Sequence, residues 1–175
     1  MRWDALFGDL ELQLEAAQAQ SQKRDVADLT RAERASVRLL DRLRAAVGRE
    51  VRITLRSGSV AGALSDVGTG WVLVHDTRER LVPLAAITSI EGLGAASAPE
   101  PSVVVRRLGL GHALRAIARD RSVVQLAAGA GLLTGRIDAV GADHVDLALV
   151  HPDSARPTGE LAVVPFGNLD LVSSV

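Results

Sequence analysis

The chain has 175 residues, 47% of them hydrophobic, and its charged groups nearly cancel to a formal net charge of -1. That balance argues against a strong general affinity for nucleic acid, and the absence of cysteine excludes disulfides, zinc-thiolate sites and thiol nucleophiles. No apolar run approaches the roughly 18 residues that a membrane-spanning helix needs, and the opening residues lack the pattern of a signal peptide. We therefore expect a soluble protein of the cytoplasm.

Residues 1–47 are expected to form a helical segment. Their first part carries an apolar stripe at spacings of three and four, made by Trp3, Leu6, Phe7, Leu10 and Leu14. A possible capping box at Thr30–Glu33 would start a second helix, but no Gly or Pro interrupts residues 9–47, so one helix or two are both allowed. The stripe either covers the rest of the protein or pairs with another chain, in which case Trp3 and Phe7 are the anchors.

Residues 48–94 have the pattern of a small five-stranded β-barrel. Short segments rich in Val, Ile and Leu are separated by glycines, as expected for strands joined by tight turns. Val51, Ile53 and Leu55 alternate with polar residues, which predicts a strand with one buried face. Trp71 is expected to cover the open end of this barrel.

The best linker in the chain is 95–102, which is small and proline-punctuated. After it, residues 103–121 end in a predicted helix that has an apolar side and a basic side. Segment 95–122 carries five basic residues against two acidic ones, so this is where an electropositive patch is expected. The candidate contact residues for nucleic acid or a partner are Arg106, Arg107, His112, Arg115, Arg119 and Arg121. The alternative is that these side chains only solvate the outer face of the helix.

Residues 103–175 repeat the pattern of a helix followed by five strands, and the segment 121–172 follows 50–91 in order. Equivalent positions are suggested by four matches: Gly58 with Gly129, Gly62 with Gly135, Gly68 with Gly141, and Pro83 with Pro165. Each such glycine marks a sharp bend or turn. We therefore expect an α+β protein with an N-terminal helical segment and two tandem five-stranded small barrels, each preceded by a helix.

The order of V-x-I-x-L, a turn, G-x-L, an apolar strand and a V-P ending resembles the Sm-like small barrels, and other SH3-like barrels share its ending. The resemblance covers residues 30–92 and again 107–173. It implies RNA binding through an Asp and Asn pair and a basic motif. Those positions hold Gly68 and Val72, Gly141 and Val145, Pro83-Leu84 and Pro165-Phe166, so the RNA pocket of that family is absent. The opening MRWDALFGDLE with RLGLGHALRAIARDRS also resembles a group of actinobacterial proteins, some labelled Fis-family regulators, although no helix-turn-helix pattern supports that label.

Acidic residues and histidines crowd the segment 138–153, namely Asp138, Asp143, His144, Asp146, His151 and Asp153. Alternation on a half-exposed strand explains them without a metal, and no local signature brings a Ser, His and Asp together for hydrolysis. We expect no enzyme, no metal and no cofactor. The expected role is a non-enzymatic scaffold or protein-interaction module that binds a protein partner or itself. The alternative is an RNA- or DNA-binding regulator using the arginine-rich helix 106–121.

Overall fold

The computed structural model describes residues 35–98, 109–129 and 131–175. Helix α2 spans Leu39–Ala45 and helix α3 spans Leu110–Arg119. No helix among the described residues is long and apolar enough to cross a membrane.

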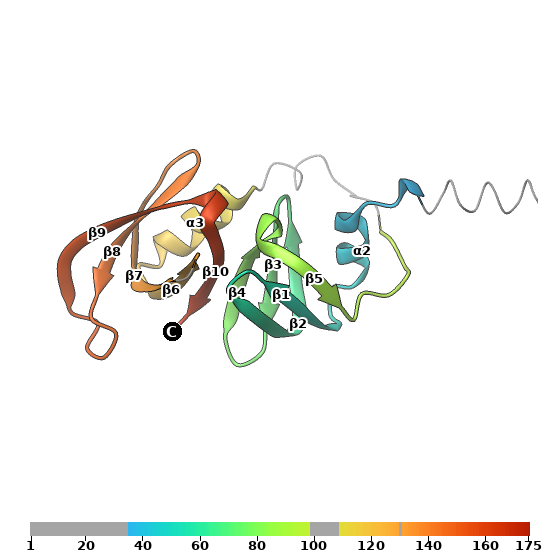
Figure 1. The fold of residues 1–175 in the computed structure, drawn as a ribbon, viewed down its shortest axis with the longest axis horizontal. Coiled ribbons are helices and arrows are strands. Elements are labelled where there is room, and N and C mark those ends of the chain that lie inside the picture. Colours follow the sequence, from blue (N-terminus) through green and yellow to red (C-terminus); the bar gives the residue numbers. More distant parts are fainter. Residues whose placement is uncertain (1–34, 99–108, 130) are drawn as a thin grey trace, which may run out of the picture. The chain divides into compact units, whose positions relative to one another are not determined.

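All ten named strands belong to one antiparallel sheet (Figure 1). Their order across the sheet is β5-β1-β2-β3-β4-β10-β6-β7-β8-β9. The strands are β1 (Glu50–Leu55), β2 (Gly58–Gly68), β3 (Trp71–His75), β4 (Glu79–Pro83), β5 (Ile87–Glu91), β6 (Val123–Ala128), β7 (Gly131–Val140), β8 (His144–Val150), β9 (Pro157–Pro165) and β10 (Leu169–Ser174). One turn of 3-10 helix precedes β5 and another precedes β10, at Leu84–Ala86 (η1) and Phe166–Asn168 (η3).

This sheet contradicts the expectation of two closed five-stranded barrels. Closing such a barrel requires its fourth strand to pair with its fifth. Strand β4 pairs instead with β10, at Leu81 with Val172 and Arg80 with Ser173, while β5 pairs with β1 and lies at the edge of the sheet. The unpaired edge of a strand can pair with any strand held beside it. For β4 that strand is β10, which comes from the second half of the same chain. The two halves therefore join in one open sheet.

Each half nevertheless uses the same strand order, fifth-first-second-third-fourth. Val51 pairs with Gly62 in one half, as Val124 pairs with Gly135 in the other. The register aligns Gly58 with a different glycine from the one expected. Gly58 faces the last residue of β1, and Gly131, not Gly129, faces the last residue of β6. The expected match of Gly58 with Gly129 is therefore two residues out.

The bulges also coincide. Strand β2 gains one unpaired residue, Ser65, where it faces β3, and β7 gains Asp138 at the same point where it faces β8. Strand β5 gains Thr88 opposite β1, and β10 gains Asp170 opposite β6. A bulge bends its strand and redirects the side chain of the extra residue, so these four side chains depart from the regular alternation.

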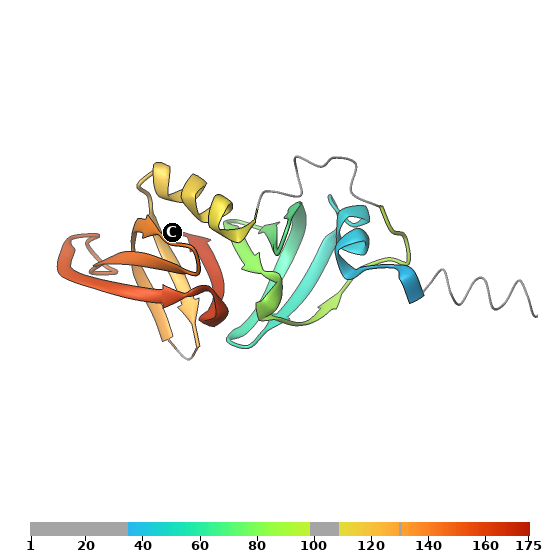
Figure 2. The same ribbon diagram turned by 90° about the horizontal axis from the view of Figure 1, so that it is seen from above.

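Two apolar clusters fill the interior. The first is made by α2, η1 and strands of the first half: Leu43, Ala46, Val51, Ile53, Leu55, Val60, Leu64, Val67, Val72, Val74, Val82 and Ala86. The second contains Leu114 of α3 together with residues of β6 to β10. Helix α3 packs against β7 (Figure 2). The second cluster also contains Trp71 and Leu81 of the first half. Trp71 therefore packs into the core of the second half instead of covering the end of a barrel, and the two halves share apolar contacts across the β4-β10 seam.

Candidate functional site

Four of the residues selected from the sequence, Trp3, Phe7, Arg106 and Arg107, lie outside the described residues. His112, Arg115 and Arg119 lie on α3, and Arg121 follows its C-terminus. The helix expected in the later part of 103–121 is confirmed.

Helix α3 presents one apolar face to the core and leaves its other faces to solvent. Leu114 is fully buried, and Leu110 and Ile117 pack against the same cluster. The spacing of three and four between these residues places them on one side of the helix. Arg115 and Arg119 are exposed as a consequence.

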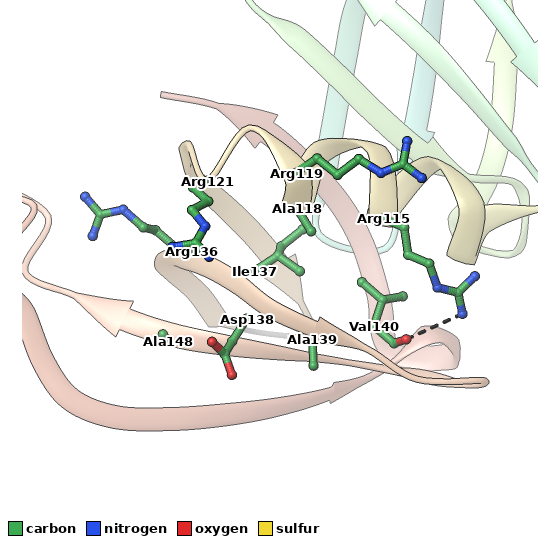
Figure 3. Close-up of a pocket in the computed structure, with 10 residues that line it drawn as sticks. All are labelled: Arg115, Ala118, Arg119, Arg121, Arg136, Ile137, Asp138, Ala139, Val140 and Ala148. Atoms are coloured by element: carbon green, nitrogen blue, oxygen red, sulfur yellow. Dashed lines mark hydrogen bonds between the residues drawn. The ribbon is translucent and has the colours of Figure 1, made fainter.

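A hollow of about 640 Å³ lies between α3 and β7, and four arginines are among the residues that line it (Figure 3). We call it the arginine hollow. Arg115 and Arg119 come from the helix, Arg121 from the turn after it, and Arg136 from β7. Asp138 is the one carboxylate in the lining, and the rest is apolar: Ala118, Ile137, Ala139, Val140 and Ala148.

The sheet register explains why distant arginines meet here. Arg136 pairs with Val123 at the start of β6, and Arg121 lies two residues before Val123. Arg121 also has a backbone φ of 52°, the left-handed conformation in which a helix commonly ends at glycine or asparagine. Arg136 could not be identified from the sequence, because the pairing of β7 with β6 is what brings it to the helix.

The arginines of the hollow differ in their bonding. The Nη2 of Arg115 donates to the carbonyl oxygens of Val140 and Gly141, at 3.4 and 3.2 Å, and these bonds, of which Figure 3 draws the one to Val140, hold that side chain against the end of β7. Among the residues that the structure describes, the guanidinium groups of Arg119, Arg121 and Arg136 have no hydrogen-bond or ion-pair partner. The hollow therefore presents positive charge in excess of its one carboxylate.

His112 lies apart from this site. It lines a second hollow of about 420 Å³ on another side of α3. Trp71, Leu81 and Ile117 also line this second hollow. The ionisable groups around it are His112 and three carboxylates, those of Asp66, Glu79 and Asp120. The predicted basic face thus divides between two surroundings of opposite charge.

His144 and Asp146 of β8 form a small surface group with Asp143, the residue before that strand. Nδ1 of His144 lies 2.8 Å from Oδ1 of Asp143, and Nε2 lies 3.9 Å from Oδ1 of Asp146. The hydrogen bond that the His144 imidazole donates to Asp143, followed by the charges of Asp146 and Asp143, raises the pKa of His144, and the same bond lowers the pKa of Asp143. The residues described include no group of three or more acidic or histidine side chains arranged to hold a metal.

Arg56, which follows β1, reaches a buried carboxylate that the sequence gave no reason to single out. Its Nε donates to Oδ1 of Asp170 at 2.8 Å, and its Nη2 donates to the carbonyl oxygen of Gly167 at 3.0 Å. Asp170 is fully buried, and its Oδ2 has no hydrogen-bond partner within the described ranges. Asp170 reaches this position because it is the bulged residue of β10.

The two edges of the sheet are β5 and β9. Strand β9 carries Leu161 and Val163 with 56% and 59% of their surface exposed. Val163 faces Asp146 of β8 as Leu81 faces Leu73 of β3, so Val163 occupies the position in its half that Leu81 occupies in the first. Leu81 is only 3% exposed. Leu81 is more buried than Val163 because β10 lies beside β4. No strand in the described part of the chain pairs with the outer side of β9.

The sequence matches no protein-family model, and comparison with curated proteins finds no relative.

Proposed function

We propose that the protein is a non-enzymatic scaffold or interaction module of the bacterial cytoplasm whose sheet edges β5 and β9 associate with further copies of the chain. The halves would then be a tandem duplication, which their common strand order and coincident bulges support. The lack of cysteine agrees with a reducing compartment.

The observation that carries the proposal is the contrast between Leu81 and Val163. The seam inside one chain joins the fourth strand of the first half to the fifth strand of the second. The same join between two chains would place β9 of one copy beside β5 of the next. It would pair Val163 with Ile90, as Leu81 pairs with Val172. An exposed apolar strand edge is a surface that natural proteins normally cover or use.

Such an association is head-to-tail, because each copy contributes a different edge. Head-to-tail contacts produce rings when the rotation closes and filaments when it does not. We therefore expect the molar mass of the protein to rise with concentration.

The test is size exclusion with light scattering over a wide range of concentration, on the unaltered chain and on Val163→Lys. A lysine at this edge should disfavour strand pairing and hold the protein as a monomer. The control is Leu132→Lys, since Leu132 is 62% exposed but lies on β7, which has a strand on both sides. That variant should assemble like the unaltered chain. A monomer at every concentration, or assembly undiminished by Val163→Lys, would refute the proposal.

The alternative role as an RNA- or DNA-binding regulator receives weaker support. Contact with a nucleic-acid backbone favours basic side chains arranged along one surface. On α3, His112 lies with carboxylates, and Arg115 is already bonded to two carbonyl groups. What remains is the arginine hollow, whose volume of about 640 Å³ is in the range of small-molecule sites.

A further inference from the structure

We propose that the arginine hollow binds a small organic phosphate that also carries hydroxyl groups, such as a sugar phosphate or a nucleoside monophosphate. This site is separate from the sheet edges, so it can be tested independently of assembly.

The charge of the hollow calls for an anion. Its lining contains four arginines and one carboxylate, and three of the guanidinium groups have no partner among the described residues. Like charges held around one cavity repel each other, and a bound anion removes that cost. A guanidinium donates two parallel hydrogen bonds to phosphate, which makes phosphate the best match among common anions.

Two departures from regular backbone geometry bring opposite charges to this hollow. Arg121 adopts the left-handed conformation at φ 52°, which is unfavourable for a non-glycine residue. Asp138 is the bulged residue of β7, and the equivalent residue in the first half is Ser65, whose hydroxyl donates to the carbonyl oxygen of Leu73. Asp138 has no such bond with the described residues and lines the hollow instead.

The carboxylate selects the rest of the ligand. Asp138 repels a second phosphate but accepts hydrogen bonds from hydroxyl groups. A ligand with phosphate at one end and hydroxyls at the other satisfies the arginines and Asp138 together.

Size and composition favour a small molecule over a nucleic-acid strand. A volume of about 640 Å³ is in the range of small-molecule sites. Proteins that bind single strands stack the bases on aromatic side chains, and the lining holds none.

The experiment is isothermal titration calorimetry at low salt with ribose 5-phosphate, inorganic phosphate, ribose, and a single-stranded oligouridylate. Ribose 5-phosphate should bind more tightly than inorganic phosphate, and ribose should not bind. Arg136→Gln should weaken the binding of ribose 5-phosphate by about tenfold or more, which is the effect of losing one charged hydrogen-bonding group. Asp138→Asn should reduce the preference for ribose 5-phosphate over inorganic phosphate without weakening the binding of inorganic phosphate.

Arg78→Gln is the matched control, since Arg78 is exposed on the β3-β4 turn and should leave binding unchanged. Arg119→Gln, at an exposed position on α3, replaces Arg136→Gln should that variant not fold. Three results would each overturn the proposal: no heat with ribose 5-phosphate, equal binding by the arginine variants, or tighter binding of oligouridylate that strengthens with its length. The last would identify a nucleic-acid surface.

Discussion

The guanidinium of Arg56 donates to the buried carboxylate of Asp170 at 2.8 Å and so links two residues separated by 114 positions in the chain. Arg56 follows the first strand of one half, and Asp170 is the bulged residue in the last strand of the other. This ion pair joins the two halves at a second place, in addition to the backbone pairing of β4 with β10.

Removing Arg56 should destabilise the fold, because Asp170 would remain buried with an uncompensated charge. Arg56→Ala is expected to lower the free energy of unfolding by about 2–3 kcal/mol, below the usual cost for a fully buried pair because its side chain is 48% exposed. The double variant Arg56→Ala with Asp170→Asn should cost less than the sum of the single changes. Urea unfolding measures all three.

The control for that cycle is Arg52→Ala, whose Nε lies 4.0 Å from an exposed carboxylate of Glu91. Loss of this surface pair should change stability by less than about 0.5 kcal/mol. Strict additivity of the changes at Arg56 and Asp170 would show that these two residues do not stabilise each other.

Gly135→Ala should destabilise the second half of the sheet. A Cβ atom there would overlap the carbonyl oxygen of Ala148 on the neighbouring strand, which is backbone and can move little. We expect a loss of about 1–3 kcal/mol, as for other overpacked sites. Gly167→Ala is the control, because a Cβ at Gly167 would meet no atom within 4 Å. Similar thermal stability for the two variants would contradict this account of Gly135.

His144 should titrate above its ordinary pKa of 6.5, because Asp143 and Asp146 favour its protonated form. A pKa raised by folding means that protonation stabilises the fold. The contribution is complete below the pKa of the unfolded chain and is lost as pH rises through the higher folded value. Proton NMR of the imidazole measures the shift, and Asp143→Asn should move the pKa of His144 down. Asp153→Asn, on the β8-β9 loop, should leave it unchanged.

The two halves should unfold together, because Trp71 and Leu81 of the first belong to the core of the second. Trp3→Phe leaves Trp71 as the only tryptophan in the chain. Its fluorescence should then follow the same denaturant curve as circular dichroism. Leu81→Ala should shift both curves together, by about 2–5 kcal/mol for a buried leucine. The exposed Leu132→Ala should shift neither. Separate transitions for the two probes would show that the seam does not couple the halves.

Strand positions could be predicted from the sequence because they depend on local alternation and glycine punctuation. The segments VRITL, SVAGALSDV, VVQL and LLTGRIDAV all lie in strands, and GWVLV does so from Trp71 onward. Closure could not be predicted in the same way, since β4 has the same pattern whether it pairs with β5 or with β10. That choice depends on a partner far along the chain.

The same reason limited what the sequence revealed of the site. Helical spacing correctly placed Arg115 and Arg119 on exposed faces of α3. Arg136 and Asp138 belong to a strand whose alternation is ordinary, and they meet the helix only through the pairing of β6 with β7 and a bulge in β7. Asp138 drew notice in the sequence as one of several acidic residues and not as a neighbour of arginines.

The Arg56–Asp170 ion pair has no counterpart at the outer edges of the sheet. By strand register, the residue equivalent to Arg56 is Gly129, and the residue equivalent to Asp170 is Thr88. A junction between two copies would therefore be stabilised only by backbone pairing and apolar contacts. Any oligomer should therefore dissociate on dilution at the boundaries between chains. Each chain should stay folded when it does, so that the folded monomer is the unit of assembly.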